Sequence, residues 1–165
     1  MFLYPSAGNP RVAVLASGFR ETRSVRCFRN AADPALREFD PDVLAGTPAQ
    51  LRRIALGTSP LRLRNAVIAL IYEGEEGLRE EDRDLFWNVF GVPVFEQYLT
   101  AGNELIASEC EAHDRMHAAG AILHSRIWAA EDGCCACGEK RALVARAAVA
   151  RSRASHSALS AARMC

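Results

Sequence analysis

The feature that most constrains the fold is an alternation of apolar runs with a helical pattern, which begins at Pro41. Residues 41–47 and 63–73 are apolar runs with polar or charged flanks, which is typical of strands buried on both faces of a sheet. Residues 48–56 between them are expected to form a helix, with Thr47 as its N-cap and a proline at its first position. A strand–helix–strand unit of this kind predicts a parallel sheet.

A second helix and three further strands extend this unit. A turn is expected over 74–77, a helix over 78–90 that Gly91 ends, and strands over 11–19, 92–100 and 104–110. In the helix we expect Trp87 and Phe90 to contact the core or the sheet, whereas Asp82 faces water. The predicted fold class is α/β, a small parallel or mixed sheet with flanking helices. The right-handed crossover rule places both helices on one face.

The predicted sheet also indicates where a ligand would bind. In open α/β sheets ligands occupy crevices beyond the carboxyl ends of the strands. Here those ends are residues 46–47, 73–76 and 98–102.

Length and charge favour one domain without a polyanionic partner. The 165 residues carry a formal net charge of zero, which gives no reason to expect nucleic acid binding. We expect a single α/β domain over residues 1–140 and a basic, Ala-rich tail over 141–165 that is helical or disordered.

The apolar segments predict neither a signal peptide nor a membrane span. The first residues lack a basic segment and contain two prolines, and the longest apolar run, 66–72, is too short to cross a bilayer. We therefore expect a cytoplasmic protein. In that compartment the six cysteines would stay reduced, which favours metal binding or redox chemistry over a disulfide framework.

Cysteine and histidine cluster in the second half of the chain. Cys110 and His117 precede a tight C-x-C-G turn that contains Cys135 and Cys137. Three thiolates and one imidazole are a ligand set for tetrahedral zinc, and with four protein ligands the site would be structural. We predict a Cys/His hairpin that binds zinc through these four residues. His113 and Cys134 are substitutes within the same stretch.

The same residues have simpler interpretations. The cysteines could be reduced loop residues and the histidines surface residues. Glu109, Glu111 and Asp114 could be an acid/base set, although a solvated loop is the favoured interpretation. Cys27 could be a nucleophile, but no partner base is identifiable, so a buried structural thiol is favoured. No catalytic residue is predicted.

Four colinear motifs carry a family resemblance. They are FDPDVLAGTPAQLRRIA at 39–55, NAVIALIYEGEEGLREEDRDLFWNVFGVPVFEQY at 65–98, ASECEAHDRMH at 107–117, and CCACGEKRALV at 134–144. In this order they resemble the phenylacetate–CoA ligase branch of the adenylate-forming acid–CoA ligases, over about half of the chain. That family joins a carboxylic acid to ATP and transfers the acyl group to coenzyme A.

The resemblance implies a nucleotide site and a metal. Gly74, Glu75 and Glu76 would lie beside the adenine, and Tyr98 and Thr100 at the adenine and phosphate end. ATP or AMP and magnesium are implied as ligands on this basis alone. The resemblance also implies a structural zinc at the Cys/His hairpin.

The chain departs from the family where catalysis needs charge. The phosphate loop has no counterpart here, and Ala101 stands where the family has its magnesium-binding Glu. The sole lysine, Lys140, lies in no catalytic motif. Adenylation needs positive charge and a metal at the triphosphate. We therefore expect a truncated homologue that binds nucleotide without activating an acid alone, and the acyl substrate stays undefined.

A second hypothesis is a non-enzymatic, zinc-stabilised module for protein interaction. A truncated sheet has edge strands, and unpaired edges invite a partner chain or a homo-oligomer. Nucleotide binding would favour the first hypothesis, and oligomerisation without nucleotide affinity the second.

Overall fold

The computed structural model describes residues 9–59, 61–113, 116–119, 128–131, 133–138 and 143–146. These ranges contain three helices and nine strands. The helices are α1 (Pro34–Phe39), α2 (Pro48–Ala55) and α3 (Glu80–Phe90). The strands are β1 (Val12–Val14), β2 (Val25–Cys27), β3 (Val43–Gly46), β4 (Ala66–Tyr72), β5 (Val94–Leu99), β6 (Leu105–Glu109), β7 (Met116–Ala118), β8 (Trp128–Glu131) and β9 (Leu143–Arg146).

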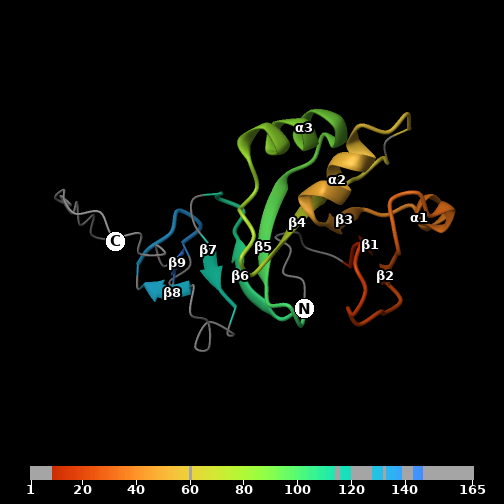
Figure 1. Cartoon of the computed structure of the whole chain (residues 1–165). Coiled ribbons are helices and arrows are strands. Elements are labelled where there is room, and N and C mark those ends of the chain that lie inside the picture. Colours follow the sequence, from red (N-terminus) through yellow and green to blue (C-terminus); the bar gives the residue numbers. More distant parts are fainter. Residues whose placement is uncertain are drawn as a thin grey trace.

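One sheet contains all nine of these strands, in the order β2-β1-β3-β4-β5-β6-β7-β9-β8 (Figure 1). Every neighbouring pair from β2 to β5 is parallel, and every pair from β5 to β8 is antiparallel. The molecule is therefore α/β with a mixed sheet, which confirms the predicted fold class. We call strands β2, β1, β3, β4 and β5 the parallel half, and strands β6, β7, β9 and β8 the antiparallel half.

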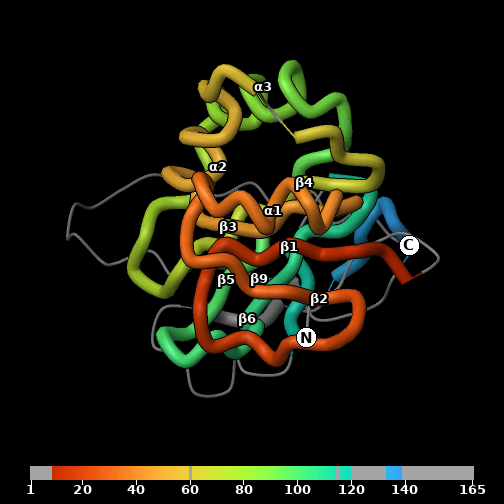
Figure 2. The backbone as a smooth tube through the Cα atoms, turned by 90° about the vertical axis from the view of Figure 1, so that its right-hand side faces the viewer, coloured from red at the N-terminus to blue at the C-terminus, as the bar shows by residue number. Residues whose placement is uncertain are grey.

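All three helices cover one face of the parallel half (Figures 1 and 2). Leu44, Val67 and Ala69 alternate with Val43 and Ile68 along β3 and β4, so successive side chains enter the two opposite apolar clusters. This double burial explains why these strands are continuous apolar runs. No helix within the described ranges is long and apolar enough to span a bilayer.

The predicted start of α2 agrees with the structure in detail. Thr47 caps the helix through its side chain, and Gln50 reaches back to the Thr47 backbone, which forms a capping box. Gln50 Nε2 also lies 2.5 Å from the carbonyl oxygen of Leu15. The helix start is therefore tied to the end of β1, which fixes one side of the crevice described below.

The interpretation of α3 was wrong at two positions. Asp82 is 5% exposed because it faces α2, where Arg52 Nη2 lies 2.5 Å from its Oδ1 and 2.6 Å from its Oδ2. Trp87, expected in the core, is 54% exposed, whereas Phe86 and Phe90 are buried. The apolar stripe of α3 is thus narrower than its sequence suggests, and an ion pair between the buried Asp82 and the exposed Arg52 joins the two helices.

Three segments differ from their predicted structure. β1 ends at Val14 instead of continuing to residue 19, because the following residues cross to β2. β2 and α1 lie in the stretch 20–40, for which no helix or strand was predicted. The predicted helical or disordered tail begins with strand β9, which pairs with β7 and β8. The remainder of residues 141–165 lies outside the described residues.

Candidate metal centre and ligand crevice

Three segments of the antiparallel half bring the Cys/His cluster together. Cys110 directly follows β6, His117 is the central residue of β7, and Cys135 and Cys137 lie in the turn between β8 and β9. Pairing of Ser108 with His117 joins β6 to β7, and pairing of His117 with Leu143 joins β7 to β9. Sheet register therefore positions residues that are far apart in the sequence.

The cysteine turn is closed by its glycine. The Gly138 N–H donates to the carbonyl oxygen of Cys135 at 2.9 Å, and Gly138 has φ +80°. A side chain at that left-handed position would be strained, so the C-x-C-G sequence has a backbone reason. The turn directs two thiols toward Cys110 and His117.

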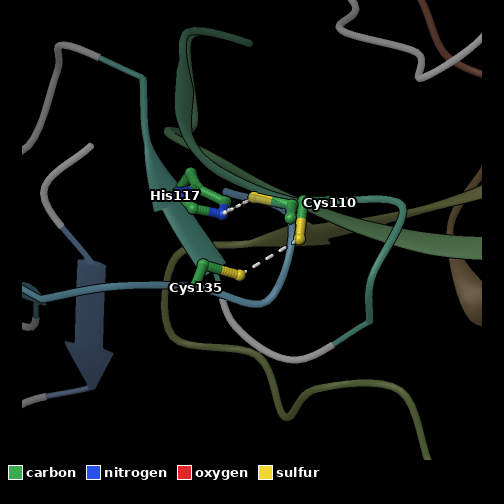
Figure 3. Close-up of side chains that lie close together, drawn as sticks. Cys110, His117 and Cys135 are labelled. Carbon is green, nitrogen blue, oxygen red and sulfur yellow. Dashed lines mark hydrogen bonds between the residues drawn. The ribbon is translucent and has the colours of Figure 1, made fainter. Parts of the chain in front are cut away.

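The four side chains have the spacing of a tetrahedral metal site. Their ligand atoms all lie within 4.8 Å of one another, with Cys110 Sγ 3.5 Å from Cys135 Sγ and Cys137 Sγ 3.4 Å from His117 Nε2 (Figure 3). Zn–S bonds of about 2.3 Å in a tetrahedron place sulfur atoms about 3.8 Å apart. The residues present therefore fit a metal ion such as zinc.

In the absence of a metal ion, burial favours the neutral thiol over the thiolate at this cluster. Cys135 and His117 are buried, and Cys110 and Cys137 half-buried. Burial raises the pKa of the Cys135 thiol to about 11, although a hydrogen bond from the Cys137 backbone acts in the opposite direction. A divalent cation reverses this balance, because a coordinating thiol is deprotonated outright.

One ring nitrogen of His117 faces the cluster, and the other makes no hydrogen bond within the described residues. Nε2 faces the sulfur of Cys137, whereas Nδ1 is buried with no hydrogen-bond partner in the described part of the chain. Metal-binding histidines usually donate this second N–H to a carboxylate or carbonyl, which orients the ring and strengthens the site. His117 lacks that support here.

The two substitute ligands lie outside the cluster. The His113 ring stacks on Phe95 with centroids 4.7 Å apart, and its Nδ1 lies 2.9 Å from Glu109 Oε1. Cys134 is exposed and is not among the four clustered residues. It is disulfide-bonded, so the expectation that all six cysteines stay reduced was wrong at this position.

The carboxylates of this stretch do not form an acid/base set within the described residues. Glu109 accepts from the Glu96 backbone N–H at 2.9 Å and from Arg83 at 3.2 Å, so its role is to join α3, β5 and β6. Glu111 is exposed, and Asp114 lies outside the described residues.

A crevice of about 740 Å³ opens at the carboxyl ends of the parallel strands. It lies where β1 is flanked by β2 on one side and β3 on the other, so the chain reverses its direction of travel across the sheet. Doubly wound sheets bind ligands at such switch points. Its lining includes Ser17, Cys27, Thr47, Tyr72, Glu73 and Asn103.

The sequence predicted one side of this crevice and missed the other. The expected strand ends at 46–47 and 73–76 contribute Thr47 and Glu73. Ser17 and Cys27 were missed because β2 was not recognised, and without β2 the strand order has no reversal. The missed signal is the short run Val25–Cys27 within a charged stretch.

The residues that the resemblance assigns to a nucleotide have different positions. Gly74 has φ +94° and begins the turn immediately after the crevice residue Glu73, and Thr100 directly precedes the crevice residue Ala101. Glu75 and Glu76 are exposed in the same turn.

Tyr98, by contrast, does not line the crevice. It is 8% exposed, and its hydroxyl donates to Glu96 Oε2 at 2.7 Å. A Cβ at Gly77 would come within 2.6 Å of that hydroxyl, so Tyr98 packs beneath the turn.

The Cys27 thiol lines the crevice without the features of a nucleophile. Burial and the nearby charge of Glu21 raise the pKa of Cys27 above its usual value. The thiol contacts the Phe19 carbonyl oxygen at 3.7 Å. A thiol that stays protonated at neutral pH is a poor nucleophile.

Comparison with known proteins gives no assignment: no protein-family model matches the chain, and no curated protein matches it.

Proposed function

We propose that this chain is a zinc-stabilised α/β module that binds a nucleotide in the crevice beyond β1, β3 and β4, and that it does not activate an acid alone. The observation that carries the proposal is the crevice at the strand reversal. A volume of about 740 Å³ lies within the usual range of small-molecule sites. The resemblance to phenylacetate–CoA ligase-type enzymes supplies the nucleotide as ligand class.

The position of the crevice supports the same ligand class. The turn 74–77 follows Glu73, and Thr100 precedes Ala101, at the rim of the crevice. The resemblance assigns this turn to the adenine, and Thr100 and Tyr98 to the adenine and phosphate end, although Tyr98 itself lies outside the crevice. Asn103 is fixed at this rim, because its Oδ1 accepts from the Tyr72 hydroxyl at 2.8 Å. A held rim favours binding, since less side-chain entropy is lost when a ligand enters.

The groups lining the crevice argue against catalysis of adenylation by this chain alone. Its lining contains no lysine, and Ala101 occupies the position of the family's magnesium-binding Glu. Without the family's metal ligand and phosphate-binding loop, Arg29 is the basic residue in the lining that is left to face the charge that develops on a triphosphate. Binding without acid activation is therefore the function that these residues support.

The proposed role of zinc is structural. Cys110, His117, Cys135 and Cys137 supply four ligand atoms, which leaves no open position for a substrate. Zinc binding would contribute directly to the folding free energy, because the ligands come from three separate segments.

The alternative, an interaction module that pairs through a sheet edge, has less support at β2. The N–H groups of Val25 and Cys27 face away from β1, and each has an acceptor: Thr22 Oγ1 at 3.1 Å and Glu21 Oε1 at 2.7 Å. The Thr22 N–H in turn donates to the Val25 carbonyl at 2.9 Å. An edge whose groups are already bonded offers little to a partner strand.

Calorimetric titration of the zinc-loaded chain with AMP, and with ATP and magnesium, tests the proposal. We expect saturable binding, and a ligand at 100 times its dissociation constant would stabilise the chain by about 2.7 kcal/mol. The variant Ala101→Trp places a bulky ring in the crevice and should abolish binding. Ala49→Trp is the matched control, because Ala49 is exposed on α2 outside the crevice.

Two results would contradict the proposal. If AMP and ATP both fail to bind at millimolar concentration, the crevice is left without its proposed ligand. Equal binding by both variants would locate the nucleotide elsewhere. Oligomerisation of a chain without nucleotide affinity would favour the interaction module instead.

A further inference from the structure

We propose that Cys110 and Cys135 are a peroxide-sensitive pair, whose oxidation to a disulfide expels the metal from the Cys/His cluster. This inference rests on the proposed structural zinc and adds a modification site to it. Their two sulfur atoms lie 3.5 Å apart and face each other within the cluster (Figure 3).

Exposure of the two thiols sets the order of events. Cys110 is half-buried and Cys135 is buried, with 7% of its surface exposed. A small hydroperoxide therefore reaches Cys110 first. Cys135 then lies at the distance of a resolving thiol. Neither residue is in a disulfide in the structure.

The chemistry balances with hydrogen peroxide as the oxidant. The Cys110 thiolate attacks one peroxide oxygen, which forms a sulfenic acid and releases hydroxide. The Cys135 thiolate then attacks the Cys110 sulfur, forms the S–S bond and releases a second hydroxide. The two sulfurs lose two electrons and the peroxide gains two, and two protons from solvent convert the hydroxides to water.

Loss of two thiolates leaves too few ligands to retain zinc. Only Cys137 and His117 remain, and structural zinc sites are almost always four-coordinate. His117 is a weak remaining ligand, because its Nδ1 has no acceptor in the described part of the chain. The ion therefore leaves when the disulfide forms.

The structural effect would fall on β7. The new disulfide would keep the end of β6 joined to the cysteine turn, which replaces one link made by the metal. His117 and Cys137 would lose their shared ion. Met116 and Ala118 would keep β7 on the core and its pairing with β6 would remain, so the effect would be confined to the side of β7 that His117 occupies.

The test is stepwise oxidation of the zinc-loaded chain by hydrogen peroxide. Zinc release is followed with a chromogenic indicator, and disulfides are identified by mass spectrometry of peptides prepared without reductant. We expect zinc release in parallel with a Cys110–Cys135 disulfide, at about one zinc per disulfide. Reductant with added zinc should restore the metal content.

Two variants separate this pair from other thiols. Cys110→Ser lacks one proposed zinc ligand, so the measurement on this variant is its disulfides and not its zinc release. Peroxide should leave Cys135 outside any disulfide. Cys27→Ser is the matched control, because Cys27 lies in the crevice, and it should respond like the unmodified chain.

The outcomes separate a failure of the redox inference from a failure of the proposed zinc site on which it rests. Metal analysis before oxidation shows whether the chain binds zinc, and an absence of zinc would contradict the proposed function itself. A zinc-loaded chain that retains its metal in peroxide would overturn only the redox inference. Zinc release with a different disulfide, or with sulfinic acids alone, would overturn it too.

Discussion

The two halves of the sheet are held by different interactions. In the parallel half, β1, β3 and β4 are almost completely buried between two apolar clusters. In the antiparallel half, the buried residues described beyond Glu109 are His117 and Cys135, both members of the Cys/His cluster. Met116 and Ala118 of β7 are only partly buried against the first apolar cluster. Partial apolar burial leaves room for another source of stability, and small metal sites supply it. We infer that a metal supplements the apolar core beyond β6.

This difference also separates the two kinds of site. The crevice lies in the half whose position is fixed by apolar burial, so ligand binding there does not require the metal. The Cys/His cluster lies in the other half, where we infer that coordination adds stability. Four experiments test whether the two halves are stabilised by different interactions.

The largest expected effect is that of a core truncation in the parallel half. Phe86 on α3 is fully buried, and Phe86→Ala should lower the free energy of unfolding by about 3–5 kcal/mol. Trp87→Ala on the same helix is the control and should change it by about 0.5 kcal/mol or less, because Trp87 is 54% exposed. Urea denaturation with and without a zinc chelator should give the same loss for Phe86→Ala. A loss that depended on zinc would show that the halves are not independent.

The next effect is that of removing one ligand from the cluster. Cys137→Ser should weaken zinc binding by at least about 100-fold, since even outer partners of a metal ligand contribute about 10–100-fold. Competition with a zinc-binding indicator measures the affinity, and Cys27→Ser is the control, because Cys27 is a free cysteine outside the cluster. Equal affinities for the two variants would contradict the assignment of Cys137.

Two glycines with left-handed φ values, one in each half, allow the same backbone strain to be introduced by substitution with alanine. Gly91 ends α3 with φ +66°, Gly138 closes the cysteine turn with φ +80°, and neither has an atom within 4 Å of an added Cβ. Either substitution by alanine should cost about 1–2 kcal/mol of backbone strain. For Gly91→Ala the cost should appear in the free energy of unfolding, whether or not zinc is present.

For Gly138→Ala the same cost should appear as about a tenfold loss of zinc affinity, because 1.4 kcal/mol is a factor of ten. Gly102→Ala is the control, since Gly102 is outside the cysteine turn, has no left-handed φ, and its added Cβ would meet its nearest atom at 3.7 Å. A Gly138→Ala variant that binds zinc normally would separate the turn from the metal.

The smallest expected effect is the acid sensitivity of the parallel half. Hydrogen bonds from Arg64 and then Arg11 hold the pKa of Asp40 below its usual range. Burial raises the pKa of Asp42, but hydrogen bonds from the Arg11 backbone and from Arg64 outweigh it, so this pKa is also lowered. Because both folded pKa values lie below the unfolded value of about 4, this contribution is present above that pH. It is lost as pH falls through the folded pKa values.

Arg64→Gln tests that direction. The variant should be slightly less stable than the unmodified chain at neutral pH, and the difference should disappear in acid, where both carboxyls are protonated. Urea denaturation across this pH range measures it. A difference that grew as the pH fell would contradict the assignment.

The sequence predicted best where local and long-range signals agreed. Thr47 and Gln50 form a capping box within four residues, and the following strand is buried on both faces, so α2 and β4 were readable from local pattern. Cys110, His117 and the C-x-C-G turn were readable because few residue types bind zinc, and the structure brings these residues together.

The failures have a common physical cause. Asp82 is buried only because Arg52 of another helix neutralises it, and that contact spans 30 residues of sequence. β2 has three residues and is defined by its pairing with β1 instead of by an apolar run. The crevice depends on that pairing, so its Ser17 and Cys27 side could not be predicted from local pattern. Tertiary contacts decide such positions, and short segments carry little signal of them.

Amide hydrogen exchange of the zinc-loaded and chelated chain would test the division between the halves most directly. If the metal supplements the core, chelation should accelerate exchange in β7, β9 and residues 133–138, while β3, β4, β5 and the core strand β6 stay protected. Equal acceleration in both halves, or no change in the antiparallel half, would contradict it.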